Sequence, residues 1–345
     1  MNKTNIFDLS FEDLERVFQD WQEPRYRTQQ VWEGLYNQFW KDADSFTSLP
    51  LSLREKLAES FIFNSVKVDT VQQSEDGETT KYLYRLHDDK AIETVIMSYT
   101  ERNTVCISSQ VGCAMACGFC ATGNMGFSRN LSPGEIVEQV VRTAETLNLS
   151  GRRLTNVVFM GMGEPFHNYD AVLKATRILN DKNGFNLGSR RITISSVGLV
   201  PGIRKFAAEK SQMNLAISLH AADDKLRSSL MPLNKKYPIS ELMKVCQEYI
   251  NLTGRRISIE WALIEGINDT PEQAVKLSEL LQGKLFHVNL IRLNPVKHFA
   301  GKPTGTDQAA VFQKTLLDAG IPCTFRLRRG IDIQAGCGQL ANLSG

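Results

Sequence analysis

The sequence contains no apolar run long enough to span a membrane, although 42% of its 345 residues are hydrophobic. Its first residues mix acidic and apolar side chains, so we expect no signal peptide. With a formal net charge of only +2, it would have to bind a nucleic acid through local basic patches. Its seven cysteines are odd in number and clustered, which argues against a secreted disulfide framework. We therefore expect a cytoplasmic protein that does not bind a membrane.

The first hundred or so residues predict a small helical domain followed by a short antiparallel β extension. The helical domain is expected over residues 1–62. Ser10 is placed to cap its first helix, which should end before Pro24. The β extension is expected over residues 63–98, with three alternating polar and apolar stretches: residues 65–71, 81–86 and 91–97.

The rest of the chain alternates short β-rich runs with amphipathic stretches. The expected strands are residues 104–108, 156–160, 191–195, 213–219, 257–264 and 287–292. The expected helices include residues 133–147, 171–179, 239–250, 272–281 and 309–319. This alternation is typical of a parallel sheet buried on both faces. Six units are two fewer than a closed barrel has, so the predicted fold class is α/β, an open (β/α)6 partial TIM barrel. Functional residues are expected at its strand carboxyl ends.

One short loop carries three cysteines, Cys113, Cys117 and Cys120, in a C-x3-C-x2-C spacing. Thiolates are the ligands that iron–sulfur clusters take, and this spacing lets one loop hold three corners of a cubane 4Fe-4S cluster. The fourth iron would then be open to a substrate or cofactor. A structural zinc site is the alternative, but it needs four ligands in paired spacing, and no second pair is present.

Small or polar residues stand at the ends of four of the expected strands. They are Gly163 and Glu164 after the second, Ser195 at the third, Ser218 and His220 at the fourth, and Asn294 after the sixth. Each alone is a common turn residue. Together with the cysteine loop, they predict a pocket for one polar cofactor beside the cluster.

On these motifs the sequence resembles, nearly end to end, the radical S-adenosylmethionine RNA methyltransferases of the RlmN/Cfr family. The resemblance rests on four segments: Cys106–Gly123, Gly161–Pro165, Ser218–His220 and Ile331–Leu340. It implies a radical S-adenosylmethionine core over residues 99–331 and a carboxyl-terminal loop, residues 332–345, that carries a methyl-accepting cysteine. Gln334 departs from the family, which often has aspartate there.

The resemblance also implies the cofactors. Cys113, Cys117 and Cys120 would hold the 4Fe-4S cluster, and the open iron would bind S-adenosylmethionine, of which two molecules are used per turnover. The residues that match its binding positions are Gly163, Glu164, Ser195, Ser218, Leu219, His220 and Asn294.

Three residues outside the cysteine loop match catalytic positions of the family. Cys337 matches the cysteine that first accepts a methyl group. Cys106 matches its partner, which resolves a protein–RNA adduct by forming a disulfide with Cys337. Glu93 matches a proton-accepting carboxylate, with a solvent-facing strand residue as the alternative. Cys246 and Cys323 are expected to be structural.

The implied substrate is 23S ribosomal RNA, with transfer RNA also possible. An electron donor such as flavodoxin or ferredoxin is implied, and the chain is expected to be a monomer. Among the basic patches, Arg326–Arg329 adjoins a site segment. RlmN-type enzymes methylate adenine C2 and Cfr-type enzymes C8, and the segment Glu260–Asp269 favours C2. A non-catalytic iron–sulfur RNA-binding module is the third alternative, against which Cys106 and Cys337 argue.

Overall fold

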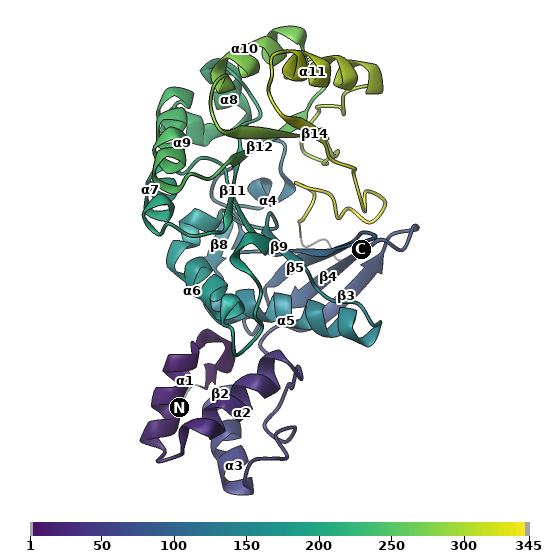
Figure 1. Ribbon diagram of the computed structural model, residues 1–345. Helices are drawn as coiled ribbons and strands as arrows, with labels where there is room; N and C mark the ends of the chain where they lie inside the picture. Colours follow the sequence, from purple (N-terminus) through teal and green to yellow (C-terminus); the bar gives the residue numbers. More distant parts are fainter. Residues whose placement is uncertain (1–2, 342–345) are drawn as a thin grey trace.

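The computed structural model describes residues 3–341. An amino-terminal helical lobe lies at one end of the molecule, against helices α5 and α6 of a larger α/β core (Figure 1). Residues 1 and 2 of the predicted helical domain lie outside the described residues. So do residues 342–345 of the predicted carboxyl-terminal loop. Among residues 3–341, no helix is both long and apolar enough to cross a bilayer.

The amino-terminal lobe folds as its sequence predicts. It contains β1 (Thr4–Asn5), a 3-10 turn (Ile6–Asp8), α1 (Phe11–Asp20), α2 (Arg25–Tyr36), α3 (Leu51–Ser60) and β2 (Phe61–Ile62). Ser10 caps α1 through a capping box, because its hydroxyl accepts from the Asp13 N–H while the Asp13 carboxylate accepts from the Ser10 N–H. Trp32 and Tyr36 are buried in the core of the lobe.

A ten-stranded sheet forms the centre of the core. Its order is β14-β13-β12-β11-β10-β9-β6-β5-β4-β3. The barrel strands are β6 (Asn103–Cys106), β9 (Asn156–Phe159), β10 (Ile192–Ser196), β11 (Asn214–Ser218), β12 (Ile257–Leu263), β13 (Phe286–Arg292) and β14 (Cys323–Phe325). Neighbouring barrel strands pair in parallel, so all six expected strands are confirmed and β14 adds a seventh.

The β extension is continuous with the barrel. Its strands are β3 (Lys67–Gln73), β4 (Thr79–Arg85) and β5 (Ala91–Ser98), which pair antiparallel as expected. Strand β5 also pairs antiparallel with β6, so the extension lengthens the barrel sheet. The sheet ends at β3 on one side and β14 on the other, which leaves the barrel open.

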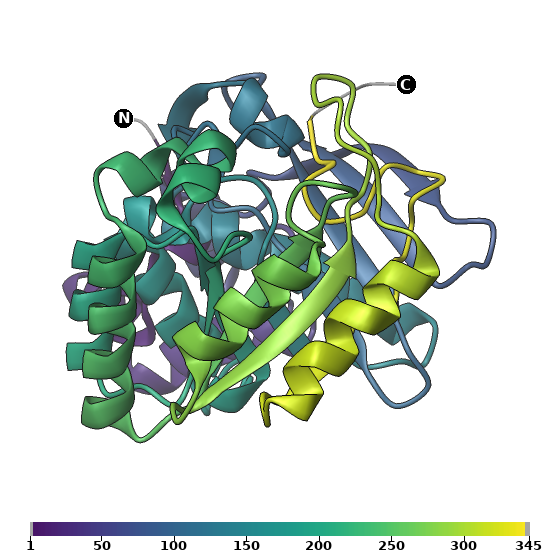
Figure 2. The same cartoon turned by 90° about the horizontal axis from the view of Figure 1, so that it is seen from above.

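Helices form an outer layer around the barrel strands (Figures 1 and 2). The layer contains α5 (Pro133–Leu149), α6 (Tyr169–Asn180), α7 (Val200–Ala208), α8 (Asp224–Leu230), α9 (Ile239–Thr253), α10 (Pro271–Leu281) and α11 (Thr306–Asp318). Helices α7 and α8 are not among the helices named from sequence, and α7 has Pro201 and Gly202 at its start. Proline is tolerated in a first turn, where its missing N–H would be unpaired.

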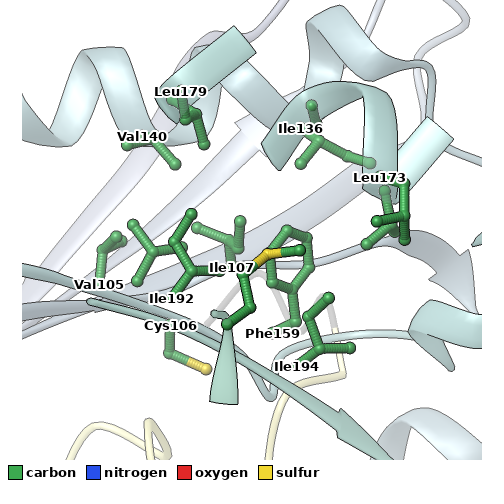
Figure 3. Close-up of a cluster of buried hydrophobic side chains, with 14 of the residues drawn as sticks. Val105, Cys106, Ile107, Ile136, Val140, Phe159, Leu173, Leu179, Ile192 and Ile194 are labelled. Carbon is green, nitrogen blue, oxygen red and sulfur yellow. The ribbon is translucent and has the colours of Figure 1, made fainter. Parts of the chain in front are cut away.

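The core packs the outer face of the sheet against α5 and α6. Figure 3 shows apolar side chains of β6, β9 and β10 meeting those of the two helices, among them Val105, Ile107, Ile136 and Leu173. Because strand side chains alternate, Cys106 points to the opposite face, towards the barrel interior (Figure 3). The barrel interior is therefore where cysteine chemistry can take place.

Candidate active site

The cysteine loop is closed at its base by a small hairpin. Strands β7 (Gln110–Gly112) and β8 (Phe127–Asn130) pair antiparallel, and the Cys113 N–H donates to the Gly126 carbonyl at 3.0 Å. Gly112 has φ +74°, and a Cβ there would lie 1.9 Å from the Gly126 oxygen. Only glycine fits this position, so the hairpin fixes where the loop leaves the sheet.

All three thiols of the loop line one cavity inside the barrel. Burial raises the pKa of Cys113 to about 12, and it raises the pKa values of Cys117 and Cys120 as well. Within residues 3–341, no three His, Cys, Asp or Glu side chains converge on a point that could hold a single metal ion. A cubane does not require such convergence, because each thiolate binds a different iron. Three thiols around one cavity therefore fit a 4Fe-4S cluster.

The strand ends supply the polar wall of the same cavity. Of the residues expected to bind the cofactor, six line it: Gly163, Glu164, Ser195, Ser218, His220 and Asn294. The side chain of Leu219 is fully buried in the core and does not line the cavity. Its N–H donates to the Glu260 carbonyl at 3.2 Å, which pairs the end of β11 with β12.

Glu164 and His220 are held in place by backbone hydrogen bonds, and burial shifts the pKa values of both. The Glu164 carboxylate accepts from the N–H groups of Phe166 (3.1 Å) and Val197 (2.9 Å), while burial raises its pKa to about 7. His220 Nδ1 accepts from the Ala262 N–H at 2.9 Å. Burial, followed by the charge of Arg227, lowers the pKa of His220 to about 3, so the ring is neutral.

Asn294, which lines this wall, has one buried polar atom without a partner among residues 3–341. Its Nδ2 donates to the Cys337 carbonyl at 3.1 Å, but its buried Oδ1 accepts no hydrogen bond from residues 3–341. Buried polar atoms are usually paired, so an unpaired acceptor on a residue of the cavity lining fits a ligand that donates. The amino and hydroxyl groups of S-adenosylmethionine are such donors.

The carboxyl-terminal loop forms part of the cavity lining beside the end of β13. It crosses between the barrel and the β extension (Figures 1 and 2) and places Cys337 and Gly338 in the cavity lining. The Gly338 carbonyl accepts from the Ala121 N–H at 2.7 Å, and the Leu340 carbonyl accepts from the Thr122 hydroxyl at 2.6 Å. These bonds tie the loop to α4 (Ala121–Asn124), directly after Cys120. Cys337 is thus fixed beside the cysteine loop.

Comparisons with known proteins agree with this geometry. The family description "Radical SAM superfamily" matches residues 107–278, and "Ribosomal RNA large subunit methyltransferase N-terminal domain" matches residues 4–63. A Chloroflexus aurantiacus protein named "Probable dual-specificity RNA methyltransferase RlmN" is 47% identical, over 99% of this chain and 93% of the relative. The chain belongs to the RlmN family of radical S-adenosylmethionine RNA methyltransferases.

Further relatives support the family assignment. A Dictyoglomus thermophilum protein with the same name is 44% identical, over 98% of this chain and 97% of the relative. The crystal structure of a radical SAM methyltransferase from Sphaerobacter thermophilus has a TM-score of 0.97 at 47% identity and covers 99% of this chain and 100% of that one. Membership implies S-adenosylmethionine, a 4Fe-4S cluster and a ribosomal RNA substrate.

Cys106 lies behind the cavity lining, close to Cys337. Its thiol faces the Met160 backbone, and burial, followed by a negative charge on Cys337, raises its pKa to about 12. No disulfide joins the two, since all seven cysteines are free. The expected disulfide is therefore not a feature of this structure. Cys246 and Cys323 are buried in the core, as expected.

Glu93 is not a solvent-facing strand residue, because it is only 1% exposed. Its Oε1 pairs with Lys81 Nζ at 3.1 Å, and its Oε2 accepts from the Ala341 N–H at 2.7 Å. It lies outside the cavity lining, beneath the carboxyl-terminal loop. Lys81 also reaches the Gln334 carbonyl at 3.5 Å, so this buried pair touches the loop on both sides of Cys337.

Three charged residues of the cavity lining were not predicted as site residues: Glu260, Arg292 and Arg326. Glu260 lies on β12, where its Oε1 accepts from Asn289 Nδ2 at 2.8 Å and its Oε2 lies 3.3 Å from Arg326 Nη1. Cys337 is exposed as a residue, but desolvation at its thiol raises the pKa of the thiol, while the Arg326 guanidinium opposes that rise. The signal for Glu260 was available, since it is an acid within an otherwise mainly apolar strand that ends at the cavity.

Proposed function

We propose that this enzyme methylates adenine C2 in 23S ribosomal RNA, and transfer RNA as well, through an S-methylcysteine on Cys337. One observation carries the proposal: Cys337 lines the same cavity as the three cluster cysteines and the strand-end residues. A methyl group on its sulfur would therefore lie where both the cofactor and a target base can reach it. The RlmN names of the relatives favour C2 over the alternative C8.

Each part of the cavity has a binding task in this proposal. Cys113, Cys117 and Cys120 hold the cluster, while the polar strand-end residues and the Leu219 backbone bind S-adenosylmethionine. When bound, the cluster and S-adenosylmethionine supply the one-electron chemistry that an electron-poor ring carbon requires. Two molecules of S-adenosylmethionine are used per turnover, one as methyl source for Cys337 and one as radical source.

The remaining assignments concern proton transfer and release of the product. The Cys106 thiolate would attack the Cys337 sulfur of the adduct, and the bond from that sulfur to the methylene carbon would break. The carbon would keep the electron pair and take a proton to become the methyl group, and a cytoplasmic thiol reductant would reduce the resulting disulfide before the next turnover. The proximity of the two cysteines inside the barrel supports this role. Glu93 would accept the proton of the target carbon, although its bonds to Lys81 and Ala341 also make it an anchor for the loop.

The wider setting is proposed on family grounds and thiol chemistry. Flavodoxin or ferredoxin would deliver electrons to a monomeric enzyme in the cytoplasm, where seven free thiols remain reduced. The proposed division is a helical domain over residues 1–62, a β extension over 63–98, the radical core over 99–331 and the methyl-carrier loop over 332–345.

Nucleoside mass spectrometry tests the proposal directly. Ribosomal RNA incubated with reconstituted enzyme, S-adenosylmethionine and an electron donor should yield 2-methyladenosine. Deuterium at C2 of the target should be lost, while deuterium at C8 should stay. Predominant 8-methyladenosine would refute the C2 assignment.

Cysteine variants separate the proposed roles. Cys337→Ala should keep its iron, accept no methyl group and modify no RNA. Cys106→Ala should accumulate a covalent protein–RNA species, because nothing would then release the adduct. Normal turnover by Cys106→Ala would contradict its role. Alanine at Cys113, Cys117 or Cys120 should remove both the brown colour and the roughly four irons of one cubane.

A further inference from the structure

A buried arginine with only neutral hydrogen-bond acceptors lies behind the cavity wall. Arg227, on α8, is 1% exposed. Its guanidinium donates to the carbonyls of Val197 (2.7 Å), Ser218 (3.2 Å) and Leu219 (3.1 Å). It also donates to the side-chain oxygen of Asn234 at 2.8 Å. These acceptors satisfy its donors but do not neutralise its charge.

The position of Arg227 links two strand ends to the cysteine loop. Val197 follows β10, whereas Ser218 and Leu219 lie at the end of β11, so one guanidinium ties together both strand ends. The end of the same helix packs against the cysteine loop, where Leu230 and Met231 form a small buried cluster with Cys117. The Leu230 carbonyl accepts from the Gly118 N–H at 2.9 Å.

A buried charge is costly unless an opposite charge compensates it. Burial lowers the pKa of Arg227 to about 10, and negative charge on Cys117, then on Asp224 and Cys246, acts in the opposite direction. The Asp224 carboxylate is already bound by Asn234 Nδ2 at 2.9 Å and by the Ile239 N–H at 2.8 Å. These neutral donors leave the Asp224 charge in place, but Asp224 is exposed to solvent, which screens its charge. An anionic cluster on the cysteine loop would supply buried compensation for Arg227.

We propose that Arg227 is the buried counter-charge of the iron–sulfur cluster and raises its reduction potential, while its carbonyl contacts position the cofactor-binding strand ends. A 4Fe-4S cluster held by three thiolates is anionic, and reduction adds a further negative charge. A cation fixed nearby in a poorly polarisable interior favours the reduced state, since such interactions are weakly screened there. Arg227 is thus a positioning residue that touches neither the cofactor nor the RNA.

The reduction potential of the cluster separates a counter-charge from a purely structural role. Only a counter-charge predicts that the potentials of the Arg227 variants follow the charge of the residue at position 227. We would load the full-length protein with its cluster and follow cluster reduction by electron paramagnetic resonance in a redox titration without S-adenosylmethionine or RNA. Arg227→Gln removes the charge, whereas Arg227→Lys keeps it but cannot reach all four acceptors. Arg142→Gln is the matched control, because Arg142 is another buried arginine but pairs with Glu138 and the Phe63 carbonyl, outside the cavity lining.

We expect the cluster of Arg227→Gln to have a lower reduction potential than the wild-type cluster. The clusters of Arg227→Lys and Arg142→Gln should keep the wild-type reduction potential. Arg227→Lys should bind S-adenosylmethionine about tenfold more weakly, because the strand ends lose charge-assisted hydrogen bonds. An unchanged potential in Arg227→Gln overturns the proposal, as does a potential in Arg227→Lys as low as that of the glutamine variant.

The lysine variant keeps the test decisive if Arg227→Gln does not fold. The cluster of Arg227→Lys must then have the wild-type reduction potential, and a lower potential refutes the role of Arg227 as a counter-charge. This inference rests on the cluster that the proposed function requires, but different results would refute the inference and the proposed function. A wild-type protein that takes up no iron refutes the proposed function, whereas a glutamine variant with normal iron and potential refutes only the role of Arg227.

Discussion

Removing the buried cation beneath the carboxyl-terminal loop should destabilise both the protein and the loop. Lys81 and Glu93 are 6% and 1% exposed, and their charged atoms lie 3.1 Å apart. In Lys81→Met the Glu93 carboxylate stays buried without this cation. Breaking a buried ion pair costs about 3–5 kcal/mol, and we expect about 3 kcal/mol because the Ala341 N–H still donates to Glu93. With an unfolding entropy of about 2 cal/mol/K per residue, this corresponds to a Tm lower by about 4 °C.

Thermal unfolding of the apo-protein and limited proteolysis of the carboxyl-terminal loop measure this effect. Lys81 contacts Gln334 as well, so its loss should expose the loop to cleavage around Cys337. The double variant Lys81→Met, Glu93→Gln should recover most of the lost stability, because a neutral amide needs no cation. A Lys81→Met protein with the wild-type Tm and the wild-type cleavage rate would refute the anchoring role of the pair.

Three further predictions test the capping, the loop geometry and the buried histidine. Ser10→Ala should cost about 1 kcal/mol in denaturant unfolding, because it removes the capping box of α1. Gly112→Ala should lose most of its iron, since the new Cβ would lie 1.9 Å from the Gly126 carbonyl oxygen, whereas Gly254→Ala, with φ +65° and open space around it, should keep its iron. Because the pKa of His220 is lowered from 6.5 to about 3, the unfolded chain binds more protons in that interval. Apo-protein stability should therefore fall by up to about 1.4 kcal/mol per unit as the pH drops below 6.5, and His220→Gln should lack this contribution in unfolding measured at pH 7 and pH 5.

The alternatives that the sequence left open are narrowed by family membership. A non-catalytic RNA-binding module does not agree with a chain that belongs to a methyltransferase family over nearly its whole length. The choice between C2 and C8 still depends on which edge of the adenine the cavity presents. Product analysis decides that question.

Several features were predictable because they depend on short stretches of chain. The spacing of Cys113, Cys117 and Cys120 defines one loop. The cap of α1 needs only Ser10 and Asp13, three residues apart. The periodicity of the core predicts six parallel strands. Helix α7 was missed where Pro201 and Gly202 resemble a turn. Strand β14 was recognisable only as a strand-like stretch, because its place in the sheet depends on pairing with β13.

By itself, the sequence determined six barrel strands, five of the helices around them, the cysteine loop and the residues at the strand ends, since local spacing and periodicity specify these. Only the tertiary structure decided that Leu219 faces the core, that Glu93 is buried against Lys81, and that Cys337 meets the cysteine loop. It also decided that Arg227 lies buried behind the cavity. Each of these depends on contacts between segments far apart in the chain, and such contacts are fixed by packing and charge burial, which no short stretch of sequence encodes.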